Sequence, residues 1–325
     1  MAGTIKLGIV SDIHYAGPSE RAGGKDYELR SLGNPLLRSF LHLYRRFVWL
    51  HDPLAQNHLL DKFLSEADGF DYLIGNGDYS CDCGSLGLSG DAAFESAKAC
   101  LEKLRAKYDA RFRGIYGDHE LGKLSFLGGR GGMRLLSWQR AQAELGLQPF
   151  WKVRAGKYLL MGVVSSLIAL PIFEPDTLPS ELPEWQRLRE DHLAQIRAAF
   201  NELEPQQRIL LFCHDPTALP FLWREDAVRA RLSQVEQTII GHLHSELILW
   251  KSRLLAGMPT IGFLGHTPKR MTTALKEARL WQPFKVRLCP ALAGIELLKD
   301  GGYLTAELDP EARQPARFAL RPLPR

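Results

Sequence analysis

The chain has 325 residues, of which 45% are hydrophobic and 24% are charged, and its formal net charge is +4. This composition is that of an ordinary globular protein with one large or two smaller domains, and the small charge does not argue for nucleic acid as a partner. Five cysteines form an odd and sparse set, which fits a reducing compartment better than a disulfide framework.

The N-terminal residues lack the pattern of a secretory signal, and no stretch reaches the ~20 consecutive apolar residues of a membrane-spanning helix. We therefore expect a cytoplasmic protein, for which a peripheral position at the inner membrane surface stays open.

Short apolar runs that end in polar residues recur along the chain and predict strands. In chain order they are IKLGIV (5–10), DYLIG (71–75), FRGIY (112–116), RILLFC (208–213) and QTIIG (237–241), followed by SDIH, NGD, GDHE, HD and HLH. The run at 209–212 is continuously apolar, as expected of a strand that is buried on both faces.

Two segments between these runs have the apolar spacing of amphipathic helices, at 91–108 and 182–203. Strands that alternate with helices predict an α/β fold in which helices cover a sheet. Near the C-terminus, 284–310 predicts strands joined by a hairpin turn at 300–302, which we expect to complete a second sheet. We predict a single domain over 1–325, with an inserted helical, lid-like segment around 20–65.

Carboxylates and imidazoles gather at the ends of the predicted strands, where α/β folds bind their ligands. The set is Asp12, His14, Asp78, Asp118, His214, His242 and His244. These ligand types, without thiolates, suit Mn, Fe or Zn, and seven ligands are too many for one tetrahedral ion. They suit two ions about 3.5–4 Å apart with a shared carboxylate, a geometry used for in-line displacement at phosphorus.

Each of these residues alone has a simpler interpretation. Asp12 can cap a turn, Asp78 can form an Asx-turn and His214 can be a buried polar partner. Alternation along a strand would direct the side chains of His242 and His244 to the same side. Five polar groups at five strand ends nevertheless favour one joint site.

In this order the motifs DxH, GD, GDHE, H and GHxH resemble those of the calcineurin-like metallophosphoesterases, over roughly residues 5–245. The resemblance implies a four-layer αββα sandwich of two mixed β-sheets, with two divalent ions, Mn favoured, at one edge. It implies that Asp12, His14 and His244 hold the first ion, that Asp78 bridges, and that Asp118, His214 and His242 hold the second. It further implies that a metal-bridging hydroxide attacks phosphorus in line and that His119 is catalytic, donating to a phosphate oxygen or protonating the leaving group.

The sequence departs from the family pattern at one ligand, because Asp118 stands where the family usually has Asn. A carboxylate adds charge and removes an amide donor. We expect the second ion to be held more tightly and to act as a weaker Lewis acid, with a changed metal preference or a slower turnover.

The segment NPLLRSFLHLYRRFVWLHDP (34–53) predicts an amphipathic helix with Asn34 as N-cap and proline at its first position. Its apolar face is expected to hold Leu37, Phe40, Leu41, Tyr44, Phe47 and Val48, and its other side Arg38, His42, Arg45, Arg46 and Trp49. The first interpretation is a helix packed on the core; the second is a lid or interfacial helix that holds an acyl chain, with arginines at lipid phosphates. The second would make the UDP-2,3-diacylglucosamine pyrophosphohydrolases of lipid A synthesis the nearest kin, to which the chain is loosely similar.

Three arginines are candidate substrate contacts, namely Arg45 on this helix and Arg130 and Arg134 in the glycine-rich stretch FLGGRGGMR (126–134). That stretch is either a flexible loop or a flap over phosphate. GHTPKR (265–270) is expected to be a surface loop, and Cys81 and Cys83 ordinary free thiols.

The expected substrate is a phosphorylated small molecule or a nucleotide-lipid, and the expected reaction is hydrolysis of a phosphodiester or pyrophosphate bond. A soluble nucleotide phosphodiesterase and a metal-binding scaffold without catalysis are the alternatives. No nucleic-acid substrate is expected, because the sequence has no basic stripe with interleaved aromatic residues.

Overall fold

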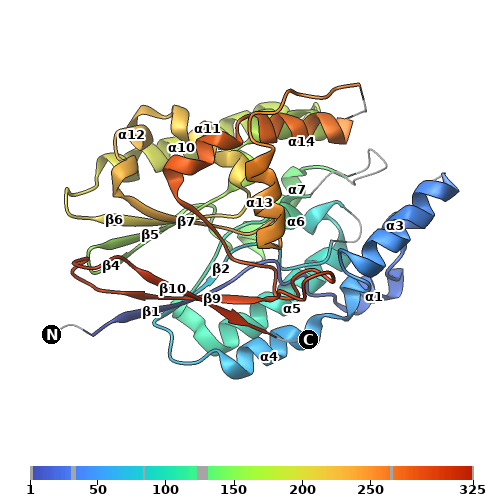
Figure 1. The fold of residues 1–325 in the computed structure, drawn as a ribbon, viewed down its shortest axis with the longest axis horizontal. Coiled ribbons are helices and arrows are strands. Elements are labelled where there is room, and N and C mark those ends of the chain that lie inside the picture. Colours follow the sequence, from blue (N-terminus) through green and yellow to red (C-terminus); the bar gives the residue numbers. More distant parts are fainter. Residues whose placement is uncertain (1–2, 31–33, 83–84, 123–130, 264–265, 324–325) are drawn as a thin grey trace.

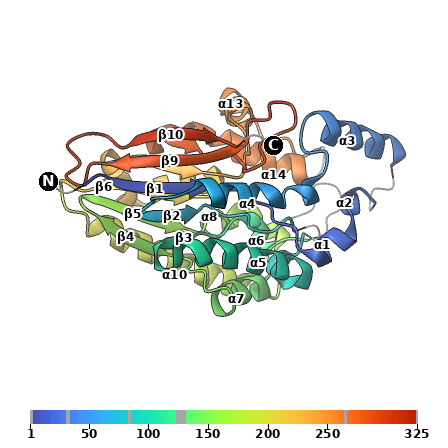
Figure 2. The same ribbon diagram turned by 90° about the horizontal axis from the view of Figure 1, so that it is seen from below.

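Two five-stranded sheets face each other and helices cover their outer faces in the computed structural model (Figures 1 and 2). The structure describes residues 3–30, 34–82, 85–122, 131–263 and 266–323. The first sheet has the order β10-β9-β1-β2-β3 and the second β4-β5-β6-β7-β8. Both are mixed, because β9, β10 and β4 run antiparallel to their neighbours while the other pairs are parallel. The predicted four-layer αββα sandwich is confirmed.

The strands of the first sheet are β1 (Ile5–Val10), β2 (Tyr72–Gly75), β3 (Phe112–Gly114), β9 (Gly302–Leu308) and β10 (Arg317–Pro322). Those of the second are β4 (Trp151–Ala155), β5 (Tyr158–Val163), β6 (Arg208–Cys213), β7 (Val235–Ile240) and β8 (Val286–Leu288). The helices are α1 (Pro18–Gly23), α2 (Tyr27–Arg30), α3 (Pro35–Phe47), α4 (Asn57–Glu66), α5 (Asp91–Tyr108), α6 (Asp118–Leu121), α7 (Leu135–Ala143), α8 (Ser165–Ile168), α9 (Leu170–Phe173), α10 (Leu182–Asn201), α11 (Leu219–Arg224), α12 (Asp226–Arg229), α13 (Glu246–Leu254) and α14 (His266–Lys276).

Strand β6 explains how the layers are held together. Leu210 and Phe212 point into the apolar layer between the two sheets, whereas Ile209 and Leu211 point to the helices that cover the second sheet. Side chains alternate along a strand, so a continuous apolar run buries both of its faces. The prediction for 209–212 is confirmed by the complete burial of these side chains.

The C-terminal prediction is correct for strands and wrong for their connection. β8 joins the second sheet beside β7, whereas β9 joins the first sheet beside β1. The turn at 300–302 therefore connects the two sheets, and the hairpin is formed by β9 and β10. The turn residues fit both topologies, and the choice depends on which exposed sheet edge each strand can pair with.

Helix α3 begins as predicted, with the Asn34 side chain accepting hydrogen bonds from the backbone N–H groups of Leu36 and Leu37. It ends at Phe47, and none of its residues is buried. The interpretation as a helix packed on the core is therefore wrong. In both views α3 projects from the end of the molecule at which β1 and β2 lead into the site (Figures 1 and 2).

Among the described residues, no helix is both long and apolar enough to cross a membrane. Cys100, Cys213 and Cys289 are free and buried. Cys81 is also buried, and Cys83 lies outside the described residues.

Candidate metal centre

The five predicted polar clusters meet at one edge of the sandwich, where β1, β2 and β3 of one sheet and β6 and β7 of the other end. Backbone hydrogen bonds continue the strand pairing into these loops, from Asp12 N to Gly77 O (3.1 Å) and from Gly241 N to His214 O (2.9 Å). The two sheets are tied together by Asp12, whose carboxylate accepts the backbone N–H of His242 at 3.0 Å. Parallel strands end on the same side of a sheet, so residues far apart in the chain converge there.

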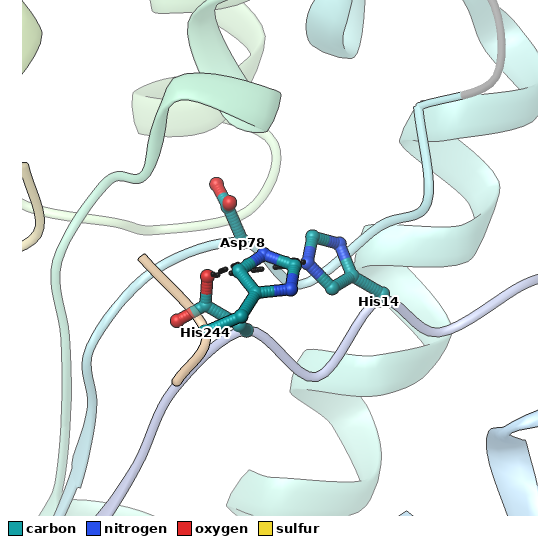
Figure 3. Close-up of side chains that lie close together, drawn as sticks. His14, Asp78 and His244 are labelled. Atoms are coloured by element: carbon teal, nitrogen blue, oxygen red, sulfur yellow. Dashed lines mark hydrogen bonds and ion pairs between the residues drawn. The ribbon is translucent and has the colours of Figure 1, made fainter. Parts of the chain in front are cut away.

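The first cluster consists of Asp12, His14, Asp78 and His244, and its potential ligand atoms all lie within 4.8 Å of one another. Figure 3 shows His14, Asp78 and His244 close together. The Nε2 atom of His244 lies 3.1 Å from Asp12 Oδ1 and 3.2 Å from the Nε2 atom of His14. The other nitrogen of His14, Nδ1, lies 3.2 Å from the carbonyl oxygen of Ser80. A carbonyl only accepts, so this Nδ1 donates and the His14 Nε2 presents a lone pair to the cluster.

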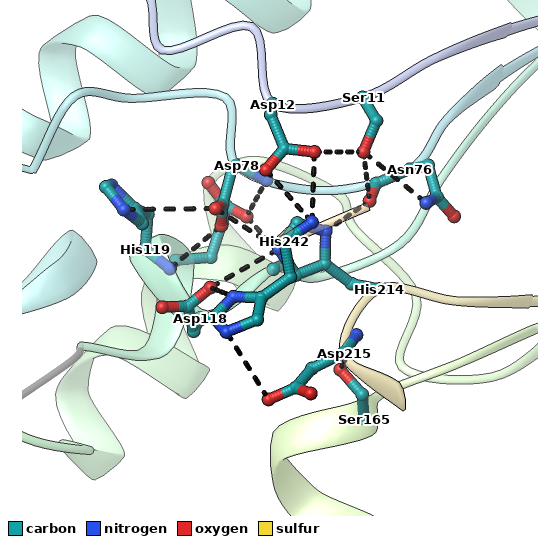
Figure 4. A network of polar contacts seen from close by, with 12 residues as sticks. Ser11, Asp12, Asn76, Asp78, Asp118, His119, Ser165, His214, Asp215 and His242 are labelled. Carbon is teal, nitrogen blue, oxygen red and sulfur yellow. Dashed lines mark hydrogen bonds and ion pairs between the residues drawn. The ribbon is translucent and has the colours of Figure 1, made fainter. Parts of the chain in front are cut away.

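The second cluster consists of Asp78, Asp118, His214 and His242 (Figure 4). His214 donates from Nδ1 to the carbonyl oxygen of Asn76 at 2.6 Å. Its Nε2 lies 3.1 Å from Asp78 Oδ2 and 3.3 Å from Asp118 Oδ1, without a hydrogen bond to either. Burial lowers the pKa of His214, but Asp78 and the other nearby aspartates outweigh it and raise this pKa well above its ordinary value. A positive charge, either a proton or a cation, is therefore favoured between this nitrogen and the two carboxylates.

Both clusters fit divalent cations by the chemistry of their donors. Each offers two aspartates and two histidines, and Asp78 belongs to both. Oxygen and imidazole ligands without sulfur suit Mn, Fe and Zn, and a carboxylate common to two clusters is the geometry of a bridged pair.

The pKa shifts of the clustered residues also favour cation binding. Burial raises the pKa of Asp12, but the charges of His244 and its other histidine neighbours outweigh it and lower this pKa below its ordinary value. Burial lowers the pKa of His242, but Asp215 and Asp118 outweigh it and raise this pKa to about 9. The carboxylates therefore draw protons onto the imidazoles, and a bound cation would replace those protons.

Several of these residues have left-handed backbone conformations that are rare outside glycine. The φ angles are 49° at Asp12, 50° at His14, 59° at Asp78 and 60° at both His242 and His244. Such strained positions persist where the surrounding structure holds them and are concentrated at functional sites. The expected strand alternation of the two histidines is wrong, because β7 ends at Ile240 and both residues follow it in a loop; each then meets a different cluster.

The glycine before Asp118 is explained by close approach. A Cβ atom at Gly117 would collide with the carboxylate of Asp78. The same loops are held by Glu120, a buried carboxylate that accepts backbone N–H groups from Gly117 (2.7 Å), Asp78 (2.9 Å) and Tyr79 (2.8 Å). Burial and the nearby Asp78 raise the pKa of Glu120 to about 8, against the effect of these hydrogen bonds. This backbone role could not be read from the sequence.

A pocket of about 120 Å³ opens beside the second cluster and was also missed from the sequence. Its wall includes Asp118 and His242 on one side and Arg270 and Phe173 on the other. Arg270 belongs to helix α14, so the expectation of a loop at 265–270 is wrong from residue 266 onward. Its guanidinium lies 2.7 Å from the buried carboxylate of Asp176. The signal in the sequence was the basic end of GHTPKR.

The buried hydroxyl of Ser166 also lines this pocket and has no hydrogen-bond partner among the described residues. A buried hydroxyl without a partner is costly in a folded protein. The pocket therefore combines apolar walls with a guanidinium and an available hydroxyl, next to the proposed cation ligands.

Of the remaining candidate site residues, His119 lies at the clusters and the described arginines lie away from them. His119 is buried beside the first cluster, with its ring centroid 4.6 Å from that of His14 and its backbone N–H bound to Asp78 Oδ1. Arg134 donates to the carbonyl oxygens of Met133 and Gly131, and Arg45 donates to that of Lys25. Neither arginine contributes to the two clusters or lines the pocket. Arg130 lies outside the described residues.

Trp49 differs from its predicted place on the arginine side of the helix. It lies beyond the end of α3, and its ring stacks on that of His244 with centroids 4.7 Å apart and an interplanar angle of 28°. The inserted segment thus contacts a residue of the first cluster directly.

The pattern of the family described as calcineurin-like phosphoesterase matches residues 5–246. No curated protein matches the sequence. Among solved structures, phosphopantetheinyl hydrolase PptH from Mycobacterium tuberculosis is similar, with a TM-score of 0.38 and 14% identity over 75% of this chain and 84% of that one. Purple acid phosphatase PPD1 from yellow lupin (Lupinus luteus) seeds gives a TM-score of 0.38 and 13% identity over 75% of this chain and 38% of that one. Because the family match covers most of the chain and all five motifs, the chain belongs to the calcineurin-like phosphoesterases and is a phosphoesterase enzyme.

Proposed function

We propose that the chain hydrolyses a phosphodiester or pyrophosphate bond with two divalent cations, Mn²⁺ favoured, held by the two clusters. Asp12, His14 and His244 hold the first cation, Asp118, His214 and His242 hold the second, and Asp78 is common to both. The observation that carries this proposal is the pair of four-residue clusters that share Asp78. When bound, the cations lower the pKa of water toward about 7 and neutralise charge on the phosphoryl oxygens.

The residues of the chain supply orientation and a proton. Asn76 and Ser80 fix the rings of His214 and His14 through their carbonyl oxygens, so that each ring directs Nε2 into the site. His119 donates a proton to a phosphoryl oxygen or to the leaving oxygen, since its ring is buried at the edge of the first cluster.

The pocket between the second cluster and α14 receives the part of the substrate beyond the reacting phosphorus. Arg270 and Ser166 supply the polar contacts there, and Phe173 contributes an apolar wall. A group bound in this pocket would hold the reacting phosphoryl group against the cations, which supports a diester or pyrophosphate over inorganic phosphate as ligand.

The substrate class favoured by the exposed helix α3 is a nucleotide-lipid such as UDP-2,3-diacylglucosamine, with the protein peripheral at the inner face of the cytoplasmic membrane. A soluble nucleotide phosphodiesterase is the second candidate, favoured by the polar residues that line the pocket beside the cations. Residues 20–65 then serve as the lid-like insertion within a single domain over 1–325.

The test combines metal analysis with hydrolysis assays. The purified protein is expected to contain about two transition-metal ions per chain, in keeping with two four-ligand clusters, and to hydrolyse a chromogenic phosphodiester. The Asp78→Ala variant is expected to lose hydrolysis while keeping the fold, as measured by circular dichroism. Full activity in that variant would refute the two-cation scheme, and bound metal without turnover on diesters, pyrophosphates or nucleotide-lipids would identify a binding scaffold.

A further inference from the structure

Helix α3 carries a row of large apolar side chains on its outer surface. The row consists of Leu36, Phe40, Leu43 and Phe47, which are 81%, 62%, 57% and 60% exposed. We call these four residues the outer stripe. Their spacing of four, three and four residues sets them on one face of the helix. A contiguous apolar face of this kind is unusual on a free surface and marks a contact with a partner or a membrane.

The rest of the apolar surface of α3 is less exposed than the outer stripe. Leu37, Leu41, Tyr44 and Val48, again spaced by four, three and four residues, are partly buried. They lie on the neighbouring face of the helix. The outer stripe is therefore not the side by which α3 is attached, and it remains available for another surface.

The charged side chains of α3 itself are all positive, and one carboxylate lies beside the helix, with Asp26 Oδ1 3.6 Å from His42 Nδ1. Residues 34–51 contain three arginines, Arg38, Arg45 and Arg46, and no aspartate or glutamate. Arg38 and Arg46 are exposed, and the guanidinium of Arg46 lies 5.6 Å from the centroid of the Phe47 ring. Apolar residues with cations at their margin match an anionic lipid surface, where the apolar side chains enter the acyl region and the cations stay at the phosphates.

The apolar surface continues from the end of α3 toward the site. The backbone N–H of Leu297 donates to Val48 O at 3.2 Å, and Leu297 and Leu298 are 54% and 48% exposed. One residue further on, Trp49 stacks on His244 of the first cluster. A surface that contacts the outer stripe would thus lie next to the entrance of the catalytic edge.

We propose that the outer stripe of α3 docks on an anionic lipid bilayer and sets the catalytic edge against the membrane surface. The inference rests on the proposed function for its substrate, a phosphoester or pyrophosphate attached to lipid. The occupant of the stripe is the bilayer itself, because the arginines and the lack of acidic residues complement lipid phosphates. A second copy of the chain would bring the same arginines into opposition.

Co-sedimentation with vesicles tests this docking without catalysis. Wild type and the inactive Asp78→Ala variant are both expected to bind vesicles of phosphatidylcholine with phosphatidylglycerol, and to bind vesicles of phosphatidylcholine alone less tightly. Phe40→Gln/Phe47→Gln is expected to weaken binding to the mixed vesicles by about tenfold or more, since two exposed rings lose their apolar contact. Arg38→Gln/Arg46→Gln should weaken binding to the anionic vesicles and remove most of its salt dependence.

A matched control distinguishes an effect of the outer stripe from the effect of removing any exposed apolar side chain. Leu43→Gln is compared with Leu320→Gln, which changes an exposed leucine of β10 (49% exposed). Only the first should reduce vesicle binding. All of these variants except Asp78→Ala should hydrolyse a water-soluble diester at the wild-type rate, so a failure of docking and a failure of the proposed reaction give different results.

Two outcomes would overturn the proposal. In one, the double phenylalanine variant binds vesicles as well as wild type does. In the other, wild type ignores vesicles but forms a dimer by sedimentation velocity that Phe40→Gln/Phe47→Gln breaks, which would assign the stripe to a second copy of the chain.

Discussion

Asp118 stands at a position where the family resemblance leads us to expect asparagine, and its contacts show which cluster this difference affects. Its Oδ1 atom lies 3.0 Å from His242 Nδ1 and 3.3 Å from His214 Nε2, so it points into the second cluster. A carboxylate there adds a full negative charge to the second cluster, whereas an asparagine would add none.

The substitution Asp118→Asn tests the effect of that charge. We expect the second cation to bind more weakly and hydrolysis by the fully loaded enzyme to become faster, because a less neutralised cation is a stronger Lewis acid. Titration with Mn²⁺ gives the affinity, and kcat at saturating Mn²⁺ gives the rate. Asp118→Ala serves as the control that removes the ligand altogether; an unchanged affinity and kcat in Asp118→Asn would contradict the assignment.

Arg270 offers a prediction about substrate choice. Arg270→Lys is expected to raise KM for a pyrophosphate or diester by about tenfold, with a smaller change in kcat, because a lysine keeps the charge but loses the forked donor geometry. Thermal unfolding of the variant reports on the ion pair with Asp176 separately. Equal KM values for wild type and variant across diesters of different size would remove Arg270 from substrate binding.

At the scale of an element, helix α10 carries a histidine that makes the free energy of unfolding depend on pH. The Nε2 atom of His192 accepts the backbone N–H of Val164, which follows β5, at 3.1 Å. Burial lowers the pKa of His192 to about 3, so the ring stays neutral in the folded protein. The unfolded chain takes up this proton below about pH 6.5, so the stabilising effect is complete above that pH and is lost as the pH falls toward 3.

We expect the free energy of unfolding of wild type to fall by about 1.4 kcal/mol more per pH unit than that of His192→Gln, between about pH 6 and pH 4. The glutamine keeps an acceptor for Val164 but does not titrate. Urea unfolding of both proteins in chelator, so that released cations do not contribute, gives the difference. Parallel pH profiles would mean that His192 is not neutral in the fold.

At the scale of the whole molecule, the candidate metal centre connects the two sheets. Asp12, Asp78 and Asp118 follow strands of the first sheet, whereas His214 and His244 follow strands of the second. Each cluster therefore takes ligands from both sheets, and a bound cation cross-links the layers of the sandwich.

Cation binding should consequently stabilise the entire fold. A ligand present at about 100 times its Kd stabilises a protein by about 2.7 kcal/mol, so Mn²⁺ added to chelator-treated protein should raise Tm by roughly 3 °C or more. Differential scanning calorimetry measures the shift, with Asp78→Ala as the variant that should respond much less. An equal rise in both proteins would indicate binding elsewhere.

The sequence predicted the elements whose signal is local. The apolar run of β6 and the helices α5 and α10 lie where the spacing of apolar residues predicts them. That spacing shows which faces of an element are buried. The role of the turn at 300–302, which connects the two sheets and not a hairpin, could not be decided in this way, because strand pairing depends on partners distant in sequence. The inner and outer faces of α3 form one amphipathic pattern in the sequence, and only packing determined which half of it is covered.

The seven candidate metal ligands could be proposed from the sequence alone, because each follows a strand end and because metal chemistry restricts ligands to few residue types. Their division into two clusters was implied by the family resemblance, and the structure brings the same residues together. What only the tertiary structure decided is the surroundings: the backbone role of Glu120, the Ser166 and Arg270 pocket, the stacking of Trp49 on His244 and the exposure of the outer stripe. These features depend on contacts between segments whose separation in the sequence is not fixed, so no local sequence pattern predicts them.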